Sequence, residues 1–181
     1  MLLMVLNFYN VIDKYIDAAY KFGVIGGALC GIAFWLMYLL GAEPVGMTLV
    51  FGYLITPIFV FIGAKNFRDN YNNREMTFGQ SMTVGFFVYT LIAVISAIIV
   101  YISLLMTPDV LIDYRAVNLQ LLDGKKSEWI DQLNVEAFET TRLSIAQMSA
   151  YNVAMNDFLR KIIPGLFYTI IISIILKQTK E

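Results

Sequence analysis

The side chains that carry most enzyme chemistry are scarce in this sequence. It contains no histidine and a single cysteine, Cys30. Serine and cysteine nucleophiles usually need a neighbouring base, and without histidine no nucleophile–base pair can be assigned. Phosphate-binding loops, paired catalytic carboxylates and dinucleotide fingerprints are also absent. The sequence therefore predicts no catalytic residue and no bound cofactor, and it favours a protein that is not an enzyme.

Two further classes of site are excluded by composition. One cysteine cannot form an intramolecular disulfide, and without histidine it cannot complete a zinc site. The formal net charge is −1 and there is no stripe of Lys and Arg, which argues against a nucleic-acid partner. The remaining candidates for chemistry at a membrane surface are the carboxylates of residues 107–161, namely Asp109, Asp113, Asp123, Glu128, Asp131, Glu136, Glu139 and Asp157.

The elements that would position any such residue are membrane helices. Hydrophobic residues make up 59% of the chain and charged residues 15%, whereas soluble domains are about half apolar and a quarter charged. A membrane-spanning helix needs about 20 apolar residues. Three segments meet this need without a charge and a shorter fourth follows, which gives spans at 22–40, 45–64, 82–106 and 162–176. The fourth is helped by Arg160, Lys161 and Lys177, whose side chains can extend to the two surfaces.

The two remaining long segments are also expected to be helical. In residues 1–21 the polar side chains fall on one stripe (Asn7, Asn10, Lys14, Asp17, Lys21). This pattern predicts an amphipathic helix, which either lies in the lipid headgroup plane or docks on the bundle. In residues 107–161 we predict a helix at 108–122, a break at 123–126, and a second helix capped by Ser127. The second helix ends near Tyr151 or runs into the fourth span. The expected fold is an all-α, four-helix membrane bundle in a single domain.

Small residues in the first span predict close helix packing. Gly23, Gly27 and Gly31 recur every four residues on one face. In lipid, such a face lets two helices approach closely. It serves either packing inside the bundle or a seam with a partner, such as a second copy of the chain. In the second span, Pro57 follows Thr56 and predicts a kink, with Thr56 or a neighbouring helix satisfying the freed carbonyl.

None of the four predicted spans has a charge in its interior. Because intramembrane charges usually mark ion or proton paths, their absence argues against proton-coupled transport.

Orientation follows from the distribution of positive charge. The loop between the first two spans has no Lys or Arg, whereas the loop between spans two and three has Lys65, Arg68 and Arg74. The N-terminal flank and the C-terminal tail are also positive. By the positive-inside rule, both termini and this loop are expected in the cytoplasm of a bacterial cell, and residues 107–161 outside the inner membrane. The three basic residues anchor the loop, or they contact lipid headgroups or a partner.

A set of motifs around this loop resembles a known family. The sequence reads Phe-Gly-Tyr at 51–53, Gly-Ala-Lys-Asn-Phe-Arg-Asp at 63–69, Thr-Phe-Gly-Gln-Ser at 77–81, Val-Gly at 84–85 and Ile-Pro-Gly at 163–165. These motifs resemble the family of small bacterial inner-membrane proteins called domain of unknown function 4199. The resemblance implies four spans and brings no established activity.

Three functions remain open on this sequence. The first is a non-enzymatic membrane scaffold or an accessory subunit of a membrane complex. It would contact the lipid bilayer and other membrane subunits or copies of itself. The second is a small oligomeric channel or transporter. The third is an enzyme acting at the membrane surface.

Overall fold

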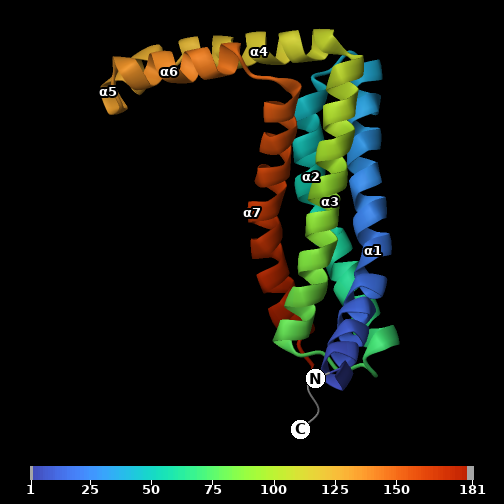
Figure 1. Cartoon of the computed structure of the whole chain (residues 1–181). Helices are drawn as coiled ribbons and strands as arrows, with labels where there is room; N and C mark the ends of the chain where they lie inside the picture. The colour runs from blue at the N-terminus through green and yellow to red at the C-terminus, as the bar shows by residue number, and fades with distance from the viewer. Residues whose placement is uncertain (1, 179–181) are drawn as a thin grey trace.

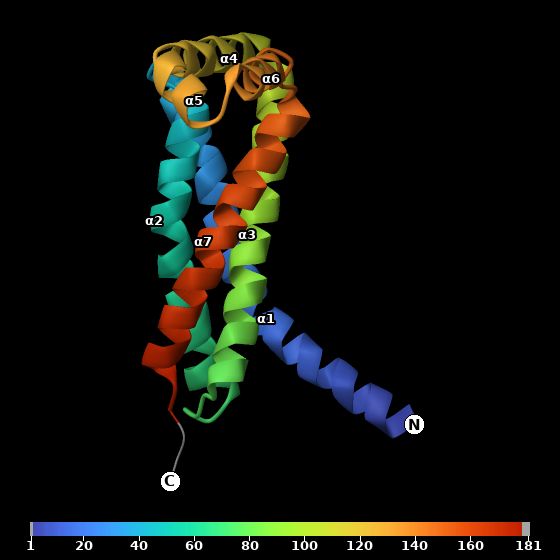
Figure 2. The same cartoon turned by 90° about the vertical axis from the view of Figure 1, so that its left-hand side faces the viewer.

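The computed structural model describes the backbone of residues 2–178 and the side chains of residues 13–178. Four long helices form an antiparallel bundle (Figures 1 and 2): α1 (Leu2–Leu39), α2 (Pro44–Asn66), α3 (Phe78–Met106) and α7 (Ala150–Leu176). Each contains a segment long and apolar enough to cross a membrane. The closest packing is between α3 and α7, α1 and α3, and α1 and α2. The chain is therefore an all-α polytopic membrane protein, as predicted.

Local signals explain where several helices begin. Glu43 precedes α2, and its carboxylate accepts hydrogen bonds from the backbone N–H groups of Val45 and Gly46. Thr77 and Gln80 form the capping box expected at the start of α3. The backbone of α2 runs on beyond Asn66 as a short π-helix, η1 (Phe67–Tyr71). The chain then turns through Asn73 and Arg74, both with positive φ, before α3.

The first helix has no boundary at residue 21. It runs unbroken from Leu2 to Leu39, so no break separates the predicted amphipathic segment from the first span. From about Tyr15 onward it is docked on the bundle, because Tyr15 stacks on Phe67 and Ala18 is buried. Its first turns lean away from the bundle (Figure 2). The side chains of residues 1–12, including Asn7 and Asn10, lie outside the described residues.

Three short helices form an arm across one end of the bundle (Figure 1): α4 (Pro108–Asp123), α5 (Lys126–Gln132) and α6 (Val135–Ala146). The predicted helix start at Pro108 is confirmed. The predicted second helix is wrong in detail, since Ser127 lies inside α5 and caps nothing. The predicted break at 123–126 is confirmed, because α4 ends at Asp123 and α5 begins at Lys126. A second break follows at Asn134, whose side chain caps α6 by accepting from the N–H of Ala137.

The fourth membrane helix is longer than predicted. It starts at Ala150, where Ser149 and Asn152 form a capping box, and it continues through Pro164 to Leu176. The predicted limits of 162–176 for this span, and of 107–161 for the outer segment, are therefore corrected to 150–176 and 107–149. As a result, Asp157 and Lys161 belong to a membrane span and not to the outer segment.

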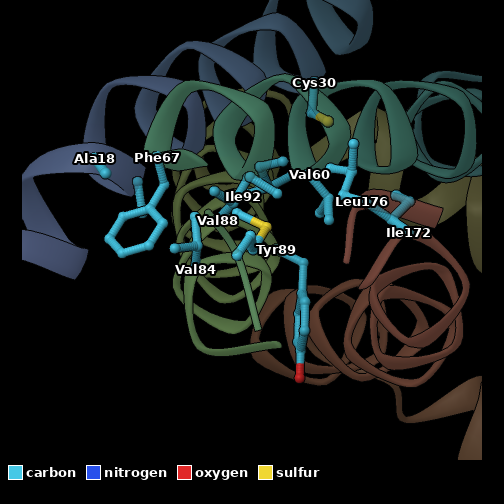
Figure 3. Close-up of a cluster of buried hydrophobic side chains, with 13 residues drawn as sticks. Ala18, Cys30, Val60, Phe67, Val84, Val88, Tyr89, Ile92, Ile172 and Leu176 are labelled. Carbon is cyan, nitrogen blue, oxygen red and sulfur yellow. The ribbon is translucent and has the colours of Figure 1, made fainter. Parts of the chain in front are cut away.

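Two apolar clusters fill the bundle. The first lies toward η1 and includes Phe67, Val84, Val88 and Ile92 (Figure 3). The second lies toward α4 and includes Phe34, Val45, Val100, Leu104 and Val153. Along α3, Ser96 falls between Ile92 of one cluster and Val100 of the other. The layer between the two clusters is where the polar side chains meet.

Candidate functional site

The central feature of the bundle is a buried ion pair on α7. Asp157 is 5% exposed and Lys161 is 1% exposed. They stand four residues apart on one helical face, and the Lys161 ammonium donates a short hydrogen bond to Oδ1 of Asp157. Ser96 of α3 donates to the other carboxylate oxygen, Oδ2, at 2.9 Å. Both oxygens of this carboxylate therefore have a partner inside the bundle.

Each membrane helix contributes to this layer. Gly52 of α2 faces Lys161, whose methylene groups occupy the space that a Cβ on residue 52 would need. Cys30 of α1 is buried beside Ser96, within electrostatic reach of Asp157 and Lys161. At about 1.5 Å per residue, Cys30, Gly52, Ser96 and Lys161 all lie about 12–17 Å from the helix ends nearest to α4. The site therefore lies within the roughly 30 Å hydrocarbon layer.

This pair contradicts one prediction made from the sequence. The spans do contain charges, so the argument against proton-coupled transport no longer holds. Lys161 was expected to extend to the membrane surface, but it points toward Asp157 in the core. Arg160 and Lys177, which were expected to extend in the same way, are both exposed. Charges at membrane depth are costly and rare, which makes the pair the leading candidate for a functional site.

The buried face of α7 is polar well beyond the ion pair. Asp157, Lys161, Gly165, Thr169 and Ser173 recur every four residues, and all five are buried. This spacing was visible in the sequence, but placing the span boundary at residue 162 divided it. Thr169 donates to the carbonyl of Gly165 at 2.8 Å. Small polar residues commonly line helix contacts in membranes. Helix packing therefore explains Gly165, Thr169 and Ser173, the part of the stripe that follows the ion pair.

Some buried hydroxyl groups in the bundle have no partner. Within the described residues, Thr56 of α2, Ser81 of α3 and Ser173 of α7 make no side-chain hydrogen bond although they are buried. Of the two predicted partners for the carbonyl freed by Pro57, Thr56 is therefore excluded and a neighbouring helix remains. The helix α2 continues through Pro57, and a kink there stays a prediction. Thr56 follows Gly52 by one turn on the same buried face, so an unpaired acceptor lies one turn from the residue that Lys161 packs against.

A small cavity leads to the ion pair from the end that carries the arm. Its volume is about 20 Å³, and Asp157 forms part of its wall. The other lining residues come from α2, α4 and α7: Val45, Gly46, Leu49, Tyr114, Val153, Asn156 and Arg160. A water molecule needs about 10–15 Å³ and polar partners. This cavity satisfies both conditions for about one water beside Asp157.

The glycine face predicted in the first span is occupied within the chain. A Cβ on Gly23, Gly27 or Gly31 would lie 2.5 Å from Leu91, 2.6 Å from Ile95 and 2.7 Å from Ile99, respectively. All three neighbours belong to α3, so this face of α1 is packed directly against α3. It leaves no room for the helix of a second chain at these positions.

The basic residues of the central loop lie at the bundle end opposite the arm. Lys65 and Arg74 are exposed, and Arg68 pairs with the neighbouring Asp69 at 2.8 Å. Both described ends of the chain lie at this same end (Figure 1). Lys14 of α1 reaches Asn72 in the loop with a hydrogen bond of 3.1 Å. Contact of the loop with lipid headgroups stays a prediction.

A second polar feature is an acidic cleft of about 450 Å³ beneath α4. Its wall includes the carboxylates of Glu43, Asp109 and Asp113. Glu43 is already used as the cap of α2. Within the described residues, no group of three carboxylate or cysteine side chains is arranged to hold a metal ion. With no histidine in the chain, the cleft offers no nucleophile–base pair.

Comparison with known proteins gives one match. The sequence model of a family described as "Protein of unknown function (DUF4199)" matches residues 21–178. No curated protein and no solved structure matches the chain. The match includes the four membrane helices and the arm.

Proposed function

The chain belongs to the DUF4199 family, and from this premise we propose that it is a non-enzymatic accessory subunit that holds a partner protein at the membrane through its α4–α6 arm. The setting proposed is the bacterial inner membrane, with both termini cytoplasmic and the arm outside. The gathering of Lys14, Lys65, Arg68 and Arg74 at the end opposite the arm supports this orientation.

The arm is the observation that carries this proposal. It projects from the bundle past α7 (Figure 1), and α5 and α6 pack mainly on other parts of the arm. Large apolar side chains on it are more than half exposed, namely Ile112, Leu121, Leu133, Val135 and Leu143. Exposed apolar residues outside a span are a common feature of protein docking surfaces.

Charge indicates the kind of partner. Residues 108–146 carry seven acidic and four basic side chains, a formal net charge of −3. Such an arm is repelled by anionic lipid headgroups and attracted to a basic surface. The partner that fits is therefore a membrane or membrane-associated protein that presents basic and apolar residues beside the bilayer. The glycine face of α1 is not available for this role, because α3 covers it.

The test is co-purification from native membranes in mild detergent, followed by mass spectrometry. A stoichiometric partner should accompany the parent protein and be lost from the charge-reversed arm variant Glu136→Lys/Glu139→Lys, in which both sites are exposed. The control is Asp17→Lys, an exposed change at the other end of the bundle. A partner retained equally by all three proteins, or no partner with any of them, would contradict docking through the arm.

A small transporter is the second candidate. The observation that favours it is the ion pair in the membrane core, Asp157 with Lys161, which an inert scaffold would not need.

A further inference from the structure

We infer that Asp157 is a proton-binding site in the membrane core, open to water only from the arm side, and that Lys161 has a second resting place at Thr56 when the proton is bound. The inference does not depend on the docking role of the arm.

An ion pair with a purely structural role would not need several features of this layer. In a structural ion pair every hydrogen-bonding group should have a partner, because unpaired buried polar groups are costly. Lys161 can donate three hydrogen bonds, yet within the described residues its ammonium has one partner, Asp157. Asp157 also borders a cavity with space for about one water. The pair is therefore incompletely satisfied on the lysine side and accessible to water on the carboxylate side.

The second position for the lysine is already present in the bundle. The end of its side chain lies against Gly52, which has no side chain of its own. Thr56 follows four residues later on the same face of α2, and its buried hydroxyl has no partner. One helical turn is about 5.4 Å, which a lysine side chain can cover by changing rotamers. Thr56 is thus an acceptor that Lys161 can use once Asp157 no longer attracts it.

The proton step balances with water as the only co-reactant. A hydronium ion in the cavity transfers its proton to the Asp157 carboxylate, which leaves a neutral carboxylic acid and a water molecule. Lys161 keeps its own proton throughout, so the site changes from neutral to a single positive charge. The ammonium then loses its ionic partner and moves to the hydroxyl of Thr56. Release of the proton to the same cavity restores the ion pair.

The groups around Asp157 fit this exchange. The titratable group from α1 is the buried thiol of Cys30, and from α4 it is Tyr114. Burial raises the pKa of Tyr114, so this phenol stays neutral beside the cavity at neutral pH. From α3 the neighbour is the hydroxyl of Ser96, and from α2 it is Gly52. On α7 itself the charged neighbours are Lys161 and Arg160.

Glu43 faces Tyr114 at the mouth of the same region. Among the residues whose side chains the structure describes, Lys161 is the one buried cation.

Infrared difference spectroscopy on the whole protein in lipid vesicles tests the inference. The C=O stretch of a protonated carboxyl group is the readout, and the part lost in Asp157→Asn is assigned to Asp157. Vesicle sidedness is set with a labelled Ser127→Cys reporter in a Cys30→Ala background. Acid added on the arm side should increase this band by about tenfold per pH unit while the carboxylate is mostly ionised. Acid on the opposite side should leave it unchanged.

Two variants distinguish a proton-binding site from an ion pair that never takes up a proton. Lys161→Met should hold Asp157 protonated across the range, so its band should be large and insensitive to pH. Thr56→Val removes the second position for the ammonium and should move the midpoint of proton binding to a lower pH by about one unit. A parent protein without a pH-dependent band, an equal response to acid on either side, or an unchanged midpoint in Thr56→Val would each overturn the inference.

Discussion

At the scale of single residues, glycine decides where the buried lysine can lie. Lys161 extends along α2 because residue 52 has no side chain, and a Cβ there would overlap its Cε atom. The fit depends on residues more than 100 positions apart in the chain. It also explains how a long, charged side chain is accommodated in a bundle of closely packed helices.

Gly52→Ala should therefore destabilise the fold. We expect a loss of about 1–3 kcal/mol from overpacking, measured as the fraction of folded protein that survives heating in detergent. The matched control is Gly79→Ala, because Gly79 is also helical but has no neighbour within 4 Å of its added Cβ. The control should be neutral or more stable by up to about 1 kcal/mol. Equal behaviour of the two variants would show that the Lys161 side chain gives way to a methyl group at residue 52 without cost.

The effects on stability of removing the two charges of the ion pair should not be additive. Lys161→Met removes the cation, so Asp157 must either stay as an unpaired buried carboxylate or take up a proton, and breaking such a pair costs about 3–5 kcal/mol. The double variant Asp157→Leu/Lys161→Met replaces both charges by apolar groups and should recover most of this loss. Thermal unfolding of the parent, the single and the double variants in the same detergent measures the difference. A double variant less stable than the single one would argue against an ion pair at this site.

At the scale of elements, the bundle is held by small residues placed opposite large ones. The glycines of α1 receive Leu91, Ile95 and Ile99 of α3, and Gly165 of α7 receives Tyr89. Helices gain little hydrophobic free energy when they leave lipid for each other, so close packing of this kind carries much of their association. The same logic makes the α1–α3 contact sensitive to added volume.

Gly27→Leu should prevent this contact. Its first added carbon alone would lie 2.6 Å from Cβ of Ile95, so we expect the folded fraction after heating in detergent to fall sharply. The comparison is Leu36→Val, at a site on the same helix that is 48% exposed toward lipid. That change should cost less. If Gly27→Leu folds normally but loses a partner or a dimer, the glycines would serve an intermolecular contact, contrary to the structure.

At the scale of the whole molecule, four crossings place the arm and the central loop at opposite ends of the bundle (Figure 1). The prediction that follows concerns sidedness. In a Cys30→Ala background, Asn73→Cys should react with an impermeant thiol reagent only from the cytoplasmic side, and Ser127→Cys only from outside. Labelling of both from one side would contradict four crossings, and the opposite pattern would reverse the proposed orientation while keeping the crossings.

Much of the architecture could be predicted from the sequence because lipid leaves few options. A long apolar segment must satisfy its own backbone in the bilayer, so it forms a helix wherever it occurs. Local chemistry then sets helix starts, as at Thr77 with Gln80 and at Pro108. These signals depend only on neighbours in the chain.

What only the tertiary structure decided is which face of each helix points inward and what it meets there. Hydropathy treated Lys161 as a surface residue, because a lysine near the end of an apolar segment usually extends to water. Its burial depends on Asp157 one turn away, Ser96 on α3 and the missing side chain of Gly52 on α2. The free energy of a buried charge is set by partners that are distant in sequence, so the polar layer could be found only once the four helices were packed together.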